Sequence, residues 1–114
     1  MPREDAYLLD ILLMAKEALD FTKDMDKEAF LSDRKSQFAV IRCFEIIGEA
    51  TKHLSDEFQR RHPDIPWSKM ARMRDLLIHA YGRVNPDEVW DTTQNDLPSL
   101  ISFLEGIVPP EEKA

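Results

Sequence analysis

The stretch DRKSQFAVIRCFEIIGEATKHLSDEF, residues 33–58, decides the fold, because its apolar residues recur every three or four positions. On a helix, this spacing gathers them into one row that can face a protein core. Ser32 or Asp33 has a side chain suited to an N-cap, so we expect a long helix from there to Phe58 or slightly beyond. Its expected inner row consists of Phe38, Ile41, Phe44, Ile47, Thr51, Leu54 and Phe58.

A similar pattern before this stretch predicts a first helix from near Arg3 to about Lys23. A polar connection, residues 23–27, follows it, and Glu28 to Leu31 form one additional brief helical turn in this interpretation. The apolar stripe of the first helix consists of Tyr7, Leu8, Ile11, Leu12, Ala15, Ala18, Leu19 and Thr22.

Prolines divide the second half of the chain. The segment from Arg61 to Trp67 ends the long helix, and Pro66 is suited to open a third helix from about Trp67 to Tyr81. Asn85 and Pro86 then provide an N-cap and a first helical residue for a fourth helix, which Pro98 kinks or restarts. The expected inner positions are Met70, Met73, Leu77 and Ala80, then Val89 or Trp90, Thr93, Leu97, Leu100, Ile101, Leu104 and Ile107.

The composition agrees with an all-α protein. The chain has 114 residues, of which 43% are hydrophobic, and only three are glycines. Four main helices with short connections predict an antiparallel four-helix bundle, with one short extra helix. We expect a single domain over residues 1–114, in which residues 109–114 form a flexible tail.

The sequence contains no apolar run of the roughly eighteen residues that span a bilayer, and its start lacks the apolar region of a signal peptide. We therefore expect a cytoplasmic protein with no membrane contact. The single cysteine, Cys43, lies in the apolar pattern of the long helix, which favours a buried structural thiol over a reactive one.

The net charge of −7 argues against a protein that coats nucleic acid by bulk electrostatics, and we expect no DNA binding. The charge is nevertheless uneven, because residues 59–83 contain six bases and two acids. Such a basic island could hold a polyanion at one place, and it could equally be an ordinary surface of mixed charge.

The best candidate for chemistry is the segment RDLLIHAY, residues 74–81. On a helix, Arg74 and Tyr81 lie about 20° apart around the axis, while Asp75 and His79 share a row. This spacing permits a phosphate site. From spacing alone, Arg74 in a salt bridge, His79 bonded at a helix end and Tyr81 as a half-buried aromatic remain the simpler interpretation.

Acidic residues on the long helix do not make a convincing metal site. Glu45 and Glu49 lie four residues apart, but neither has the histidine three residues later that carboxylate metal sites in bundles use. Solvated charges, or a pair between Arg42 and Glu45, explain them better. His53 and other histidines lack ligand spacing, so we predict no metal.

Taken together, the motifs of this chain resemble the HEPN superfamily and, within it, the HepT toxins. The resemblance covers nearly the whole chain. It rests on Ile46-Ile47-Gly48-Glu49-Ala50, His62-Pro63-Asp64-Ile65-Pro66-Trp67, Met73-Arg74-Asp75 followed by His79-Ala80-Tyr81, Val89-Trp90 and Asp96-Leu97-Pro98.

This resemblance implies a homodimer in which two Arg-x4-His motifs, Arg74 and His79 of each chain, meet in a composite site for metal-independent RNA cleavage. It also implies a toxin–antitoxin partner: a nucleotidyltransferase of the MNT type that neutralises the toxin by transferring AMP to the motif tyrosine, here Tyr81. No cofactor is implied.

RNA cleavage without a metal needs a base, an acid and cations near the phosphate. Two His79 rings could supply the base and the acid, the two Arg74 side chains could hold the phosphate, and Asp75 could orient His79. Further candidates for RNA contact are Lys69, Arg72 and Arg83.

Two other functions remain open at this point. A non-catalytic helical partner of a nucleotidyltransferase would keep the dimer and the surroundings of Tyr81 but would cleave no RNA. A simple dimerisation bundle would tolerate the loss of Arg74, His79 and Tyr81 together.

Overall fold

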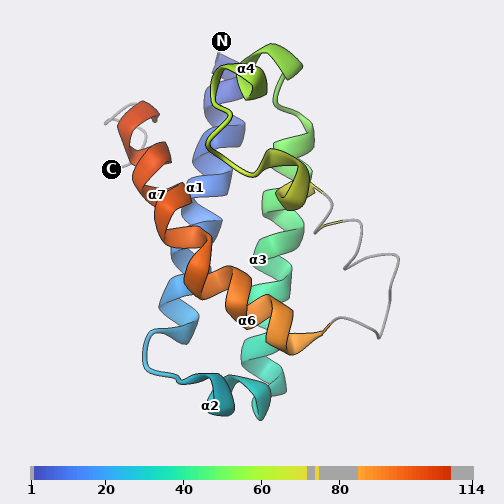
Figure 1. Ribbon diagram of the computed structural model, residues 1–114, viewed down its shortest axis with the longest axis vertical. Coiled ribbons are helices and arrows are strands. Elements are labelled where there is room, and N and C mark those ends of the chain that lie inside the picture. Colours follow the sequence, from blue (N-terminus) through green and yellow to red (C-terminus); the bar gives the residue numbers. More distant parts are fainter. Residues whose placement is uncertain (1, 72–73, 75–84, 109–114) are drawn as a thin grey trace.

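The computed structural model describes residues 2–71, 74 and 85–108, and every regular element among them is a helix (Figure 1). This confirms the prediction of an all-α fold. The helices are α1 (Pro2–Thr22), α2 (Lys27–Leu31), α3 (Arg34–Lys52), α4 (Asp56–Arg61), α6 (Pro86–Asn95) and α7 (Leu97–Ile107), and residues 67–71 and 74 are also helical.

The two longest helices, α1 and α3, lie side by side and run in opposite directions (Figure 1). The consecutive helices α6 and α7 form a bent rod across them, and α7 packs mainly on α1. Short helices close the two ends, with α2 at one and α4 at the other. Residues 67–71 and 74 belong to the expected third helix, and the remainder of that helix lies outside the described residues, as does the expected tail, 109–114.

One continuous apolar core joins α1, α3, α6 and α7. Full burial of one large aliphatic side chain stabilises a fold by about 1.5–3 kcal/mol, so the buried side chains of this core are the main source of stability. The buried core residues include Leu8, Ile11, Leu12, Ala15 and Ala18 of α1, Phe44, Ile47 and Ala50 of α3, Val89 of α6, and Leu97, Leu100 and Leu104 of α7.

Polar caps begin the helices where the sequence predicts them. Asp33 precedes α3, and its side chain accepts hydrogen bonds from the backbone N–H groups of Lys35 and Ser36. The Ser36 hydroxyl donates to the same carboxylate, and these bonds hold the pKa of Asp33 below its ordinary value. Asn85 caps α6 in the same way, by accepting from the N–H of Asp87 at 2.9 Å.

The prediction of one helix from Asp33 to Phe58 was wrong, because α3 ends at Lys52 and α4 starts at Asp56. Ser55 lies between them and accepts a hydrogen bond from the N–H of Phe58, while its own N–H donates to Glu4 at 3.0 Å. Side-chain bonds of this kind compete with helix continuation. The apolar row continues across the break, since both Leu54 and Phe58 are buried.

Phe38 was also assigned wrongly to the inner row of α3. Its side chain is 58% exposed, and its ring lies beneath the guanidinium of Arg34 at 5.3 Å. Phe38 lies in the first turns of α3, and Val40 is buried in this part of the helix instead. The predicted row is otherwise correct from Phe44 onward, because Phe44, Ile47 and Thr51 are buried.

Of the kink or restart predicted at Pro98, the structure shows a restart. Helix α6 ends at Asn95, α7 begins at Leu97, and Pro98 occupies the first turn of α7, where a proline removes no helical hydrogen bond. Asp96 joins the two helices by donating its N–H to the carbonyl of Thr92.

Cys43 is buried in α3, as expected, and this burial raises the pKa of its thiol to about 11. The thiol therefore stays protonated near neutral pH, which agrees with a structural role. In the part of the chain that the structure describes, no helix combines the length and the apolar character that a membrane span requires.

Candidate active site

A glycine brings the segment that carries Arg74 unusually close to α3. Gly48 is buried, and a Cβ placed on it would lie 3.1 Å from the carbonyl oxygen of Met70 and 3.2 Å from the Cα of Arg74. Such distances leave no room for a side chain beside that backbone. Gly48 therefore lets the helical residues 67–71 and 74 rest directly on α3, with Arg74 next to Glu49.

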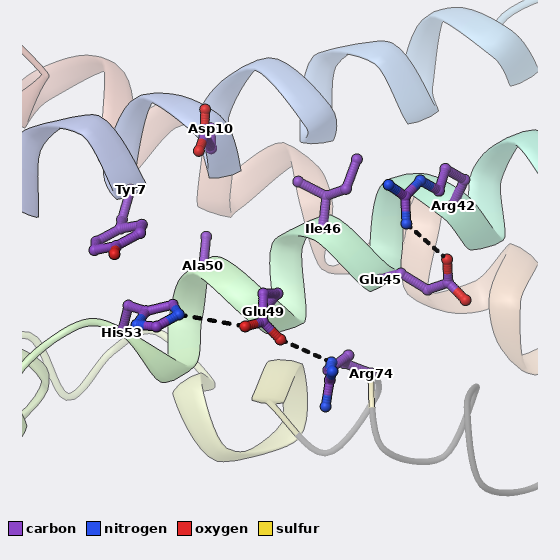
Figure 2. Close-up of a pocket in the computed structure, with 9 residues that line it drawn as sticks. All are labelled: Tyr7, Asp10, Arg42, Glu45, Ile46, Glu49, Ala50, His53 and Arg74. Atoms are coloured by element: carbon purple, nitrogen blue, oxygen red, sulfur yellow. Dashed lines mark hydrogen bonds and ion pairs between the residues drawn. The ribbon is translucent and has the colours of Figure 1, made fainter.

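Glu49 bridges Arg74 and His53 (Figure 2). Its Oε1 forms an ion pair with Nε of Arg74 at 2.9 Å, and its Oε2 lies 3.3 Å from Nε2 of His53. Glu49 is in the last turn of α3 and His53 is the C-cap of this helix, four residues later, so the end of the helix sets their spacing. The three side chains form a line that runs along α3 toward Arg74.

The other end of this line is held by α1. The Tyr7 ring stacks on the His53 ring with a centroid separation of 4.7 Å and an interplanar angle of 10°. Stacking of this kind restricts the rotation of both rings. The arrangement thus joins three segments that are distant in sequence: the start of α1, the C-terminal end of α3 and the chain near Arg74.

These side chains line an open groove of about 480 Å³, a size typical of small-molecule and cofactor sites. Asp10, Arg42 and Glu45 complete its polar lining, and Arg42 pairs with Glu45 at 3.2 Å. Two arginines and three carboxylates therefore face the groove, in addition to His53. The lining residues are Tyr7, Asp10, Arg42, Glu45, Ile46, Glu49, Ala50, His53 and Arg74 (Figure 2).

The structure describes only two of the residues proposed for the site. Arg74 lies at the groove with 30% of its side chain exposed. Lys69 is on the same helical segment but pairs with Asp96, at the junction of α6 and α7, at 2.8 Å. The remaining predicted residues, Arg72, Asp75, His79, Tyr81 and Arg83, lie outside the described residues.

The predicted pair of Arg42 and Glu45 is confirmed. Glu49 interacts with both a cation and a histidine. Among the described residues, no three histidine, cysteine, aspartate or glutamate side chains group as metal ligands.

A sequence model of HepT-like proteins, described as "Ribonuclease HepT-like", matches residues 11–107. The chain belongs to the HepT-like ribonuclease family. This confirms the resemblance drawn from its motifs, and at the level of the family it confirms the prediction of a ribonuclease. Among solved structures, none matches the chain significantly.

Three relatives of this HepT-like chain carry the names of ribonucleases. It is 46% identical to "Putative RNase MJ0127" of Methanocaldococcus jannaschii, over 95% of this chain and 91% of the relative. It is 52% identical to "Probable ribonuclease HepT" of Thermococcus cleftensis, over 89% of this chain and 92% of the relative. A protein of Caldanaerobacter subterraneus, "Putative RNase TTE0752", is 37% identical over 93% of this chain and 95% of the relative.

Sequence reasoning missed the side chains that hold Arg74 in place, which are Glu49 and, through it, His53 and Tyr7. Glu49 was interpreted as a solvated charge, His53 as a surface or capping residue and Tyr7 as part of the core stripe; His53 is indeed the C-cap of α3. One signal was available: Gly48 interrupts a strongly helical pattern directly before Glu49, and a glycine costs about 1 kcal/mol there relative to alanine, which points to a packing reason for it. The segment that approaches Gly48 is the one that carries Arg74. The glycine alone does not identify it, because the contact depends on how the helices cross.

Proposed function

We propose that this HepT-like protein is the toxin of a toxin–antitoxin pair and cleaves RNA without a metal at a composite site of two protomers. Arg74 and His79 of each protomer form that site. The observation that carries this proposal is the position of Arg74, which is held by Glu49 at the edge of a groove while part of its side chain reaches solvent. Membership of a ribonuclease family supports the substrate class.

The chemistry proceeds by transesterification. One His79 takes the proton of a ribose 2′-hydroxyl, whose oxygen attacks the adjacent phosphorus. The bond from phosphorus to the 5′-oxygen breaks, and the second His79 protonates that leaving oxygen. The products are a 2′,3′-cyclic phosphate and a 5′-hydroxyl end. The first His79 has gained a proton and the second has lost one.

Two protomers are needed because one histidine cannot comfortably act as both base and acid in the same step. A two-fold axis would place two copies of the motif at one site, as closed dimers do. The two Arg74 guanidinium groups would then stabilise the additional negative charge on the phosphorane, because a guanidinium matches phosphate oxygens with paired N–H donors. Asp75 supports His79 in this arrangement, and Lys69, Arg72 and Arg83 are candidates for contact with the flanking phosphates.

Control of the toxin comes from modification of Tyr81, two residues after His79. A cognate MNT-type nucleotidyltransferase, the antitoxin, transfers AMP from ATP to the tyrosine oxygen, which loses its proton as pyrophosphate leaves. The AMP group adds bulk and negative charge next to the catalytic motif. Both effects oppose the binding of a phosphate backbone. The partner of the toxin is therefore this nucleotidyltransferase.

The experiment is intact-mass measurement with peptide mapping, on protein produced alone and with its neighbouring nucleotidyltransferase, followed by an RNA cleavage assay. We expect one AMP on Tyr81 and loss of cleavage only in the co-produced sample. The Tyr81→Phe variant should gain no AMP. AMP on another residue, or cleavage that persists in fully modified protein, would contradict this form of control.

A second function, a non-catalytic helical partner of a nucleotidyltransferase, is favoured by charge. The chain carries −7 overall, and the groove beside Arg74 has three carboxylates against two arginines. An acidic surface opposes the binding of RNA by general electrostatics. Protein that binds the nucleotidyltransferase but cleaves no RNA, modified or not, would establish this function instead.

A further inference from the structure

We propose that Glu49 is a positioning residue for RNA cleavage, which acts by holding the Arg74 guanidinium in the orientation that receives the scissile phosphate. This inference rests on the proposed function of Arg74. It assigns a role in the reaction to a residue outside the Arg-x4-His motif, on a different helix.

The ion pair between Glu49 and Arg74 restrains the orientation of the Arg74 guanidinium group. Nε is the guanidinium nitrogen closest to the backbone, and it lies 2.9 Å from Oε1 of Glu49 in an ion pair. A guanidinium is planar, with five N–H donors in a rigid fork. Once Nε is bound to a carboxylate, the plane of the group and the directions of its other donors are set as well.

Glu49 is itself held in place from the opposite side. Its second oxygen, Oε2, lies 3.3 Å from Nε2 of His53, and the His53 ring stacks on Tyr7. Gly48, the preceding residue, brings the backbone of Arg74 against α3. A carboxylate supported in this way can orient its partner before any substrate arrives, and such preorganisation is what an arginine that stabilises a transition state requires.

The ion pair of Glu49 and Arg74 is solvent-accessible, so it adds little to the stability of the fold. The Glu49 side chain is 52% exposed and that of Arg74 is 30% exposed. Ion pairs at this exposure contribute little to the stability of a fold. Loss of the pair should therefore leave folding nearly unchanged while it disturbs the direction of Arg74.

The sign of its charge excludes Glu49 as a direct ligand of phosphate. A carboxylate repels the RNA backbone, so removal of Glu49 takes a negative charge away from the binding surface. RNA binding should then stay equal or become tighter, while the chemical step slows. A decrease in kcat together with an unchanged or lower KM is the signature of an interaction that acts in the transition state and not in ground-state binding.

The test is a steady-state comparison of Glu49→Ala and Glu49→Gln with a matched control, Glu45→Ala. Glu45 lies one turn earlier on α3, lines the same groove and pairs with Arg42, which makes it a carboxylate of equal charge that does not hold Arg74. We expect Glu49→Ala to lower kcat by about 10- to 100-fold without raising KM. Glu49→Gln should retain more activity, because its amide oxygen can take the place of Oε1 beside Nε, and Glu45→Ala should keep at least about half of the parent kcat.

A double-mutant cycle identifies the route by which Glu49 acts. If it works through Arg74, Glu49→Ala should lower the residual activity of Arg74→Ala by less than about twofold. A further decrease of tenfold or more would show that Glu49 acts elsewhere and would overturn the inference. If cleavage by Arg74→Ala is too slow to measure, the comparison of Glu49→Ala with Glu45→Ala decides alone.

The possible failures are distinct. Parent-like kcat in Glu49→Ala, with an inactive Arg74→Ala, would refute the positioning role and leave the proposed function intact. Parent-like kcat in Arg74→Ala would refute the proposed function itself. Thermal unfolding of each variant monitors folding, and a loss of kcat in Glu49→Ala that merely follows a loss of folded protein would count against the inference.

Discussion

Gly48 and Arg74 occupy adjoining positions on two helical segments, with no room between them for a side chain on Gly48. A Cβ on Gly48 would lie 3.2 Å from the Cα of Arg74 and would also meet its Cβ. The position of the proposed catalytic arginine therefore depends on the absence of a single methyl group from α3.

The first prediction concerns this contact. Gly48→Ala should force the segment of Arg74 away from α3 and destabilise the protein, because overpacking costs about 1–3 kcal/mol while the helix propensity of alanine returns only about 1 kcal/mol. Thermal or urea unfolding measures the change. RNA cleavage should fall as well, since Glu49 no longer meets Arg74.

Gly106, the other glycine in the described helices, has open surroundings and serves as the control. A Cβ on Gly106 of α7 would meet no atom within 4 Å. Gly106→Ala should therefore stabilise the protein by about 0.5–1 kcal/mol through helix propensity alone. If Gly48→Ala were equally stabilising, the close approach of the two segments would be refuted.

The second prediction concerns pH. Burial raises the pKa of the Cys43 thiol from its ordinary value of 9.0 to about 11. The folded protein thus favours the neutral thiol, so this contribution to stability is complete below pH 9 and is lost as the pH rises to about 11. The free energy of unfolding should fall over that range by at most about 3 kcal/mol from this group.

Other groups also titrate in that range, so Cys43→Ala serves as the reference. The parent should lose more stability than this variant between pH 8.5 and 10.5, at roughly 25 °C, in urea unfolding. Parallel curves for the two proteins would show that the thiol is not shielded from solvent.

The third prediction concerns the break between α3 and α4. Ser55→Ala removes the hydrogen bond that Phe58 donates to the Ser55 hydroxyl, and loss of such a cap costs about 1 kcal/mol. Ser102→Ala, at an exposed position inside α7, should be neutral or slightly stabilising. Equal unfolding free energies for the two variants would contradict the role of Ser55 as a cap.

Local signals in the sequence predicted most of the helix boundaries. Asp33, Asn85 and Pro98 act within one turn, so their effects are visible in the sequence itself. The break at Ser55 was missed because the apolar row continues through Leu54 and Phe58, and because the N–H of Ser55 is bound by Glu4, which is distant in sequence. Periodicity reports the face of a helix and does not report such tertiary bonds.

The candidate site was predictable only in part for the same reason. The sequence indicates Arg74 and His79 through their spacing and through the family resemblance. It does not show that Glu49 pairs with Arg74, or that His53 and Tyr7 hold Glu49. These contacts require three segments that are distant in sequence to meet at one place. The pair of Arg42 and Glu45 was predicted, since both residues lie on one helix.

The measurement that tests the central claim most directly is the end chemistry of RNA cleaved by the parent, Arg74→Ala and His79→Ala proteins. We predict that the parent leaves 2′,3′-cyclic phosphate and 5′-hydroxyl ends, and that each variant cleaves at least about 100-fold more slowly. Parent-like cleavage by either variant, or products that carry 3′-hydroxyl and 5′-phosphate ends, would contradict the composite Arg-x4-His site.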